Sequence, residues 1–464
     1  MRQFELLLVF ATLFAVLWPA VFGVRPKRGI VAVVLVAALV LQLQVEGYRW
    51  QLVPLYVLAV GLAVGDVLFI DRNLKWSNRI ARAVGGVAGV GLAALLAVGL
   101  PVPTLPIPSG PETIGTATFE ITDPNRDEIY GPNPVGPRRF MAQVWYPAKP
   151  VEGLEPAKWS EDWDVVAPAV ALNLGFPSWF LDHTRYVESN GYASLPPAEG
   201  TFPVIVYSHG WNGFRTIAIN QIETLVSNGY MVIAPDHTFG SVVTRMDDGS
   251  VIEFDPNALP DEEEVGEEAY LEAGNVLIST FAADITTILD GLEEGEGGPF
   301  GRLGAVADLT RVGVYGHSTG GGAAVKLCLE DERCDAVVGL DPWVEPLPDR
   351  VIRNAVTRPS LYMRSDSWRD TKNDSVLRGL AGRSSEVTYW LGVEGAAHND
   401  FVVAPLLSPF GSQLGLTGPI APGRIVPIVD NYLLGFFDVF LLGTGSAALD
   451  NVSFEEVSVE LITP

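Results

Sequence analysis

Four apolar stretches occupy the first hundred residues of this chain of 464 residues, and short polar segments separate them. Each stretch approaches the roughly 20 residues that a helix needs to cross a bilayer. One cleaved signal peptide would account for the first stretch but not for four. The pattern therefore predicts a transmembrane four-helix module over residues 1–103, with spans at 6–24, 29–45, 52–70 and 83–102.

Basic residues are concentrated in two of the three loops between these stretches. The segments "VRPKR" and "DRNLKWSNRIAR" carry seven Lys or Arg together, whereas "EGYRW" carries only Arg49. Loops rich in Lys and Arg stay in the cytoplasm. We therefore expect the N-terminus and everything after the fourth helix to be extracytoplasmic. A single acid, Asp66, lies in the third stretch; it marks an ion path or, as we favour, pairs with a neighbouring loop near a helix end.

The pattern changes after a proline-rich segment, "PVPTLPIPSGP", which predicts a linker over residues 104–114. Beyond it, "TATFEITD" and "RFMAQVWYPA" alternate apolar and polar positions, as a pair of half-buried strands does. Short continuous apolar runs follow, typical of strands covered on both faces. Helical spacing lies between them, for example over 272–294. We predict an α/β catalytic domain over 115–464, mainly a parallel sheet with helices on both faces.

Two further segments are interpreted from their polar residues. The run 424–442 is interrupted by Asp430, Asn431 and Asp438, so we expect an amphipathic final helix and not a fifth span. The acidic run 261–268, "DEEEVGEE", is interpreted as a solvated loop.

Charge is divided unevenly between the two parts. Formal net charge is −25, although residues 1–103 carry +5, so the remainder carries −30. Such a domain repels nucleic acid and anionic lipid surfaces, which excludes nucleic acid as a partner. The two cysteines, Cys328 and Cys334, lie in "CLEDERC" without a nearby histidine that would suggest a metal site. A local disulfide and two free thiols both remain open for them.

A candidate nucleophile lies in the sequence "VGVYGHSTGGGAAV". Gly316-His317-Ser318-Thr319-Gly320 has the form G-x-S-x-G, follows an apolar strand and opens a helix, which is the setting of a nucleophile elbow. A sharp strand-to-helix turn strains the serine backbone, and side chains two residues before and after it would clash. The hydroxyl of Ser318 would then lie at the carboxyl edge of the sheet.

A serine nucleophile needs a base, and the base needs an orienting acid. Of five histidines, His398 is the only one well C-terminal to the serine, and it follows a predicted strand. His317, adjacent to Ser318, is expected to point away from it. The acid should lie between serine and base at a strand end, where both Asp341 and Asp366 qualify.

Two backbone amides are candidates for an oxyanion hole. One belongs to Thr319, directly after the serine. The other belongs to Trp211 in "IVYSHGWNGFRT", where an apolar strand ends and Gly210 and Gly213 allow the backbone to turn its amides inward.

The segments "YSHGWNGFRT", "GHSTGGG", "GLDPW" and "GAAHNDF" together resemble the platelet-activating-factor acetylhydrolase family (plasma type) of α/β-hydrolases, over roughly residues 115–443. The resemblance implies the α/β-hydrolase fold and makes Asp341, in the "LDPW"-like motif, the triad acid in place of Asp366. It assigns the oxyanion amides to Trp211 and Thr319. We also expect Trp343 to line the substrate pocket.

These features predict a membrane-anchored serine ester hydrolase that acts on short-acyl esters, including phospholipids, through Ser318, His398 and Asp341 and an acyl-enzyme. The mechanism calls for no metal or organic cofactor. The alternatives are a general carboxylesterase or cutinase-type polyester hydrolase, and a membrane sensor that carries a silent hydrolase fold. The oligomeric state does not follow from the sequence.

Overall fold

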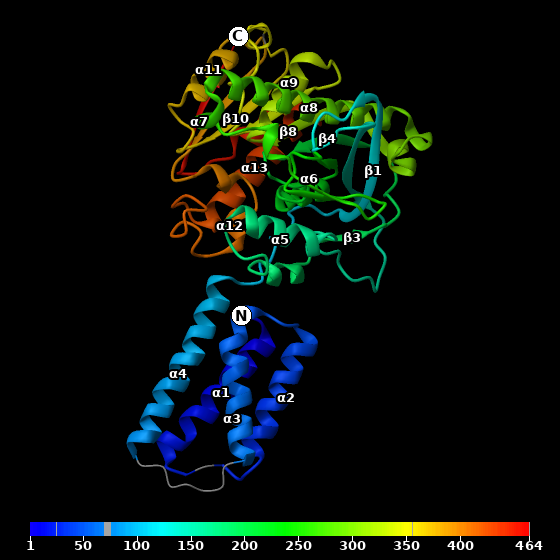
Figure 1. Cartoon of the computed structure of the whole chain (residues 1–464). Coiled ribbons are helices and arrows are strands. Elements are labelled where there is room, and N and C mark those ends of the chain that lie inside the picture. The colour runs from blue at the N-terminus through cyan, green and yellow to red at the C-terminus, as the bar shows by residue number, and fades with distance from the viewer. Residues whose placement is uncertain (25, 69–75, 355, 464) are drawn as a thin grey trace. The chain divides into compact units, whose positions relative to one another are not determined.

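The computed structural model describes residues 1–24, 26–68, 76–354 and 356–463, which divide into two compact units. One unit contains Met1–Pro103 with two short later segments, and the other contains nearly all of the remaining chain. Both are drawn in Figure 1.

Four long helices form the first unit, and they run through the predicted apolar stretches. They pack around a shared core of small and branched apolar side chains that includes Leu8, Leu35, Leu55 and Ala93. Its elements are α1 (Gln3–Phe22), α2 (Ile30–Val45), η1 (Trp50–Leu52), α3 (Val53–Leu68) and α4 (Trp76–Gly99). The predicted end of the third stretch, at 69–70, lies outside the described residues, as do Arg25, Arg72 and Lys75 of the basic loops.

Buried and partly buried polar contacts join the helices of this unit. The Arg49 guanidinium lies 2.8 Å from the Glu5 carboxylate, and it donates to the backbone carbonyls of Ala97 and Leu100 at 3.3 and 2.5 Å. Asp66 accepts a hydrogen bond from the N–H of Gly29 at 2.9 Å, at the start of α2. Asp66 therefore pairs with a neighbouring loop, as the sequence led us to favour.

Length and apolar composition alone qualify four described helices as membrane spans: α1, the segment Trp50–Leu68, α4 and α8 (Glu267–Glu293). Ile30–Val45 is apolar but shorter. Helix α8 differs from the other three because 61% of its most apolar window is buried within the protein, where its side chains join the core of the second unit.

A ten-stranded, mostly parallel sheet forms the centre of the second unit, in the order β12-β11-β10-β9-β8-β4-β5-β2-β1-β3. The leading pair β1–β2 is antiparallel, and strands β5, β4, β8, β9, β10 and β11 run parallel. The strands are β1 (Thr113–Asp127), β2 (Pro137–Ala148), β3 (Gly191–Ala193), β4 (Phe202–Ser208), β5 (Met231–Asp236), β8 (Ala307–His317), β9 (Ala336–Leu340), β10 (Ser360–Ser365), β11 (Thr388–Val393) and β12 (Val457–Ile462).

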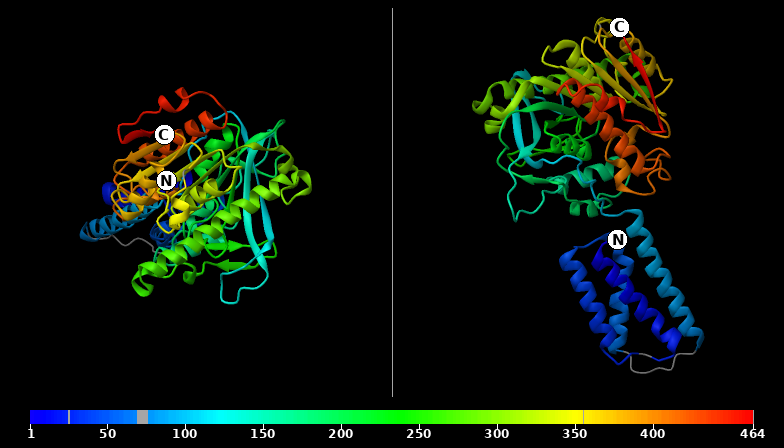
Figure 2. Two further views of the ribbon diagram at one scale, coloured as in Figure 1. Left: turned by 90° about the horizontal axis from the view of Figure 1, so that it is seen from above. Right: turned by 180° about the vertical axis from the view of Figure 1, so that it is seen from behind.

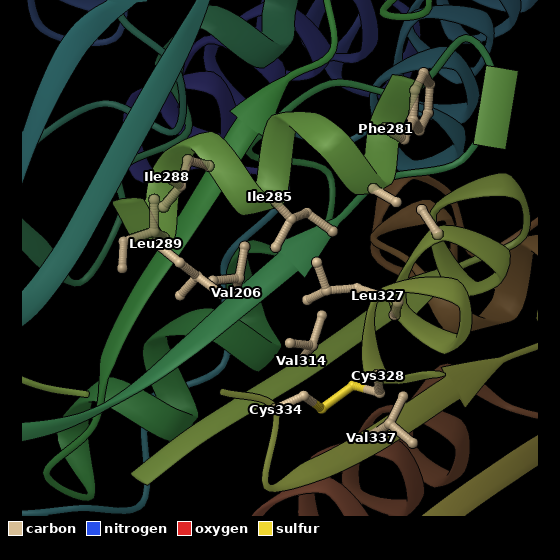
Figure 3. Close-up of a cluster of buried hydrophobic side chains, with 14 of the residues drawn as sticks. Val206, Phe281, Ile285, Ile288, Leu289, Val314, Leu327, Cys328, Cys334 and Val337 are labelled. Atoms are coloured by element: carbon tan, nitrogen blue, oxygen red, sulfur yellow. A yellow bond between two sulfur atoms is a disulfide. The ribbon is translucent and has the colours of Figure 1, made fainter. Parts of the chain in front are cut away.

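Helices cover both faces of this sheet, which confirms the predicted mixed α/β architecture (Figure 2). Successive residues of a strand point to opposite faces. In β8, Val314 joins the core that α8 and α9 (Thr319–Glu330) share, whereas Tyr315 packs near Phe437 of α13 (Pro422–Phe440) on the other face. The apolar run of β8 is therefore continuous because both faces are buried. Figure 3 shows the α8–α9 side of this core.

The remaining elements are short or lie in the connections. Helix α6 (Ile219–Ser227) follows β4, and α13 forms over most of the run 424–442, where we expected the final helix; the one-turn helix α14 (Ala447–Asp450) follows it. The others are α5 (Trp163–Asn173), η2 (Asp182–Tyr186), β6 (Val243–Arg245), β7 (Val251–Glu253), η3 (Pro256–Ala258), α7 (Glu262–Val265), η4 (Gly295–Gly297), η5 (Gly301–Val306), α10 (Asp349–Ile352), α11 (Lys372–Ala381), η6 (His398–Phe401) and α12 (Ala404–Leu407).

The acidic run 261–268 is not the loop that we predicted. Its residues form the one-turn helix α7 and the start of α8, with exposed side chains. The Asp261 carboxylate accepts a hydrogen bond from the N–H of Glu263 at 2.9 Å and caps α7. Acidic residues are favourable in the first turn of a helix, where they face the positive end of the helix dipole. The acidic residues that we interpreted as a solvated loop therefore lie at the N-terminal ends of two helices.

Cys328 of α9 and Cys334 form a disulfide (Figure 3). It joins the last turns of α9 to the segment before β9, and both residues are buried within the α8–α9 core. Of the two alternatives that the sequence left open, the structure has the bonded pair.

Candidate active site

Ser318 lies at a sharp turn between β8 and α9. Its φ is 57° and its ψ is −122°, a conformation that a non-glycine residue adopts only under strain. A Cβ at Gly316 would lie 2.3 Å from the carbonyl oxygen of Gly320, and one at Gly320 would lie 2.1 Å from that of Ser208. The glycines of the G-x-S-x-G pattern are thus required by close backbone approach, and the turn leaves Ser318 partly exposed beside the N-terminus of α9.

The structure brings Asp341 and His398 into direct contact. His398 Nδ1 lies 3.0 Å from Asp341 Oδ2. Asp341 follows the end of β9 and is 1% exposed, and its carboxylate accepts hydrogen bonds from the N–H of Ser365 at 2.9 Å and the Ser365 hydroxyl at 2.6 Å. A carboxylate held in this way fixes the imidazole orientation and keeps its proton on Nδ1.

Backbone hydrogen bonds connect Ser318 to the segment that contains Asp341. The N–H of Ser318 donates to the carbonyl of Leu340 at 3.0 Å, and its own carbonyl accepts from the N–H of Trp343 at 2.8 Å, so both sides of Asp341 are tied to the serine. Among the described residues, no hydrogen bond joins the Ser318 hydroxyl to His398. Such bonds are often long in ligand-free enzymes and tighten only with substrate.

The alternative acid, Asp366, lies elsewhere. Its carboxylate accepts the N–H of Gly395 at 2.6 Å and pairs with Arg369, and its side chain is 46% exposed. It thus holds the turn after β11 and not the imidazole. Spacing along the chain could not separate Asp341 from Asp366, because both follow strands of the same parallel sheet.

Two aromatic side chains near His398 were not expected from the sequence. The Trp368 ring stacks on the imidazole with centroids 4.4 Å apart and planes 5° apart. The His317 ring lies 4.3 Å from it, and His317 Nε2 donates to the carbonyl of His398 at 2.9 Å. His317 therefore supports the loop of His398. The only signal for Trp368 was its place two residues after Asp366 in "RSDSWRD".

The loop after β4 lies against the nucleophile. A Cβ at Gly210 would lie 3.0 Å from Ser318 Cβ, so the Gly210–Trp211 peptide is adjacent to the serine. Thr319 is the first residue of α9, and the first N–H groups of a helix have no acceptor within it. The two predicted oxyanion residues thus lie on segments that flank Ser318. Trp343 is only 8% exposed and its ring packs near Tyr270, so its place in a substrate pocket stays a prediction.

A second Ser–His–Asp chain lies on the same sheet. The Ser208 hydroxyl is 2.8 Å from His237 Nε2, and His237 Nδ1 is 3.0 Å from Asp284 Oδ2. Arg138 donates to both oxygens of Asp284, at 3.1 and 2.8 Å. Although burial would raise the pKa of Asp284, the Arg138 guanidinium holds it well below its usual range. Ser208, His237 and Asp284 are all 0% exposed, so this chain is inaccessible to a substrate.

No group of three or more His, Cys, Asp or Glu in the described parts of the chain could hold a metal ion.

Comparisons with known proteins show the family to which this chain is similar. The model of the family "Platelet-activating factor acetylhydrolase, isoform II" matches residues 141–253 and 300–441, which is more than half of the chain. The matched segments contain Ser318, Asp341 and His398 together with the loop of Trp211.

Several curated relatives are named platelet-activating factor acetylhydrolase. A platelet-activating factor acetylhydrolase of Cavia porcellus is 23% identical over 52% of this chain and 58% of its own length. One of Gallus gallus is 22% identical over 54% and 64%. The chain thus matches less than two thirds of either protein. A "Probable 1-alkyl-2-acetylglycerophosphocholine esterase" of Arthroderma benhamiae is 22% identical over 74% of this chain and 90% of its own length.

A solved structure, a ferulic acid esterase from Streptomyces cinnamoneus, superposes with a TM-score of 0.61 and 25% identity, over 77% of this chain and 99% of the esterase. These relatives are ester hydrolases by name. The fold, the serine turn and the family match lead to one conclusion: this chain belongs to the platelet-activating factor acetylhydrolase, isoform II, family.

Proposed function

We propose that this chain is a membrane-anchored serine hydrolase that cleaves short-acyl esters, including phospholipids with a short acyl group. The observation that carries the proposal is the 3.0 Å contact of His398 with the buried Asp341, beside the strained turn of Ser318. The family match and the names of the relatives support an ester as the substrate.

Each catalytic step follows from this arrangement. The Ser318 oxygen attacks the ester carbonyl carbon while His398 Nε2 accepts the hydroxyl proton, and Asp341 stabilises the imidazolium that forms. The N–H groups of Trp211 and Thr319 bind the oxyanion. His398 then donates the proton to the leaving alcohol, which leaves an acyl group on Ser318. Water attacks that acyl-enzyme, His398 takes its proton, and the acid departs as the proton returns to the serine.

The acidity of the Asp341–His398 pair predicts the pH dependence. Burial raises the pKa of Asp341 to about 7, against the hydrogen bonds from Ser365 that lower it, and burial lowers the pKa of His398 to about 4. The working pair has a neutral imidazole, which keeps one proton, and an ionised carboxylate. It therefore forms when the additional proton of the Asp341–His398 pair leaves near pH 7. We expect kcat/KM to rise about tenfold from about pH 6 to about pH 8. A pH–rate profile that is flat over this range would contradict the assignment.

The relatives suggest two substrate classes that can be separated directly. The Arthroderma protein is named for an alkyl-acetylglycerophosphocholine, and the Streptomyces protein for ferulic acid. We expect kcat/KM of the full chain in detergent to fall steadily from acetyl to palmitoyl at the second position of a glycerophosphocholine. Methyl ferulate is the competing substrate, and faster cleavage of it than of the acetyl phospholipid would favour the general carboxylesterase alternative.

Membrane anchoring is proposed from the surface of the helical unit. Large apolar side chains are exposed on each of its four long helices, for example Phe10, Val33, Val57 and Leu95 at 65, 69, 68 and 59%, whereas its ion pair Arg49–Glu5 is buried. This inside-out distribution is typical of helices in lipid. We expect the full chain to stay in the membrane pellet after alkaline carbonate and to be released by detergent. Release by carbonate alone would exclude spanning helices.

The positive loops further suggest that the catalytic unit lies on the extracytoplasmic side. The disulfide Cys328–Cys334 supports this orientation, because such bonds persist in oxidising compartments.

A further inference from the structure

His209 is a buried residue that directly precedes the Gly210–Trp211 peptide. Its Nδ1 lies 2.7 Å from the carbonyl oxygen of Gly210. Its Nε2 lies 3.2 Å from the backbone N–H of His237 and 2.9 Å from the Ser241 hydroxyl. A backbone N–H can only donate, so Nε2 must be the unprotonated, accepting nitrogen. The proton of the neutral ring is therefore on Nδ1, which donates it to the carbonyl of Gly210.

This hydrogen bond sets the direction of a specific amide. The described residues contain no cis peptide bond, and in a trans peptide the C=O and the following N–H point in opposite directions. Holding the carbonyl of Gly210 therefore also fixes where the N–H of Trp211 points. The N–H of Gly213 donates to the same carbonyl at 2.9 Å, so His209 supplies one of two anchors. The peptide is adjacent to Ser318, as the 3.0 Å approach at Gly210 shows.

The surroundings of His209 hold the ring in this orientation. Its centroid lies 4.9 Å from that of His237 and 5.7 Å from that of Phe281, whose ring meets it edge-on. His237 is itself fixed between Ser208 and Asp284. Burial, together with the neighbouring His237, lowers the pKa of His209 well below its ordinary value, so the ring stays neutral. The buried Ser208–His237–Asp284 chain thus holds His209 in place, and His209 in turn holds the Gly210–Trp211 peptide.

We propose that His209 is a positioning residue that aims the N–H of Trp211 at the substrate oxyanion by holding the carbonyl of Gly210. The inference rests on the proposed ester hydrolysis at Ser318 and adds to it the origin of one oxyanion donor. His209 touches no substrate; it acts through the Gly210–Trp211 peptide. Misplacement of a catalytic group by about 1 Å costs about a hundredfold in rate, and loss of one oxyanion donor costs about a hundred- to a thousandfold.

Three substitutions at position 209 test the inference in the full chain. His209→Ala removes the donor, His209→Asn places an N–H near the position of Nδ1, and His209→Gln extends its amide toward the position of Nε2. We expect kcat to fall about 10- to 100-fold in the Ala and Gln variants while KM stays within about twofold, and we expect Asn to restore most of kcat. Thermal unfolding of each variant shows whether it is folded.

The comparison of Asn with Gln decides the outcome. A role in packing alone would make the two amides equivalent, or would make the longer Gln the better substitute, and either result would overturn the proposal. So would an Ala variant with unchanged kcat. If Ala and Gln fail to fold, a folded Asn variant that loses more than about tenfold in kcat also overturns it.

Wild type and Ser318→Ala, measured beside them, separate this inference from the function on which it rests. Equal rates for wild type and Ser318→Ala would contradict the proposed hydrolysis at Ser318, and the inference about His209 would then fail with it. If the wild-type rate depends on Ser318, the proposed function stands, and the variants at position 209 then test the role of His209 by themselves.

Discussion

Replacing Ser318 by alanine is expected to lower kcat by about 10⁴- to 10⁶-fold and to abolish labelling by a fluorophosphonate probe. The Ser318 hydroxyl is the proposed nucleophile. The backbone of this residue has a φ of 57°, and the neighbouring glycines that allow this turn are unchanged in the variant. KM should change little, because alanine removes no surface that holds the substrate. Ester hydrolysis and mass spectrometry of the labelled peptide measure both effects.

Ser208→Ala is the matched control for this experiment. Ser208 also has a histidine partner, at 2.8 Å, and an aspartate behind it, but it is fully buried. We expect the Ser208→Ala protein to retain labelling at Ser318. Labelling that disappears with Ser208 and persists in Ser318→Ala would assign the nucleophile to the buried chain and overturn the proposed site.

Replacing Asp341 by asparagine is expected to lower kcat by about 10⁴-fold with the fold retained. Asparagine has the shape of the acid but can donate to His398 Nδ1 through its amide, which favours the tautomer with the proton on Nε2. That tautomer cannot accept the proton of Ser318. The loss should be in kcat, measured on the short-acyl ester that wild type cleaves best, with the circular dichroism spectrum unchanged.

Asp366→Asn provides the comparison at the other candidate acid. Its carboxylate holds the N–H of Gly395 and lies near the surface, so we expect kcat within about threefold of wild type, as for most surface substitutions. If Asp366→Asn were the more damaging change, the assignment of the acid would be reversed.

Most of the order of strands and helices could be predicted because the inner strands of the sheet leave a strong local pattern, whereas the two edge strands β3 and β12 were not predicted. Continuous apolar runs such as "RVGVY" arise where both faces are buried, and the alternation in "TATFEITD" arises at the antiparallel start. The acidic run 261–268 was misinterpreted because charge in the first turn of a helix and charge in a loop look alike in composition. The structure distinguishes them by the backbone hydrogen bonds from Val265 to Asp261 and from Gly266 to Glu262, together with the cap that Asp261 forms on Glu263.

The candidate site was partly predictable for a related reason. Ser318 and His398 stand at strand ends with recognisable neighbours, whereas the choice of Asp341 over Asp366 depends on which loop reaches the imidazole. The contacts of Trp368 and His317 with His398, and the buried chain through His237, join residues far apart along the chain. Their side chains meet only after the sheet has assembled, so no spacing in the sequence indicates them.

The disulfide of α9 bears on how the protein should be produced. A cross-link that closes so short a loop contributes about 2 kcal/mol to the free energy of unfolding, and Cys328 lies at the far end of the helix that Ser318 begins. Protein made in a reducing cytosol would lack that bond and carry two thiols inside the core. The chain should therefore be produced by export to an oxidising compartment. Weak activity of a cytosolic preparation would reflect the missing disulfide and would not test the role of Ser318.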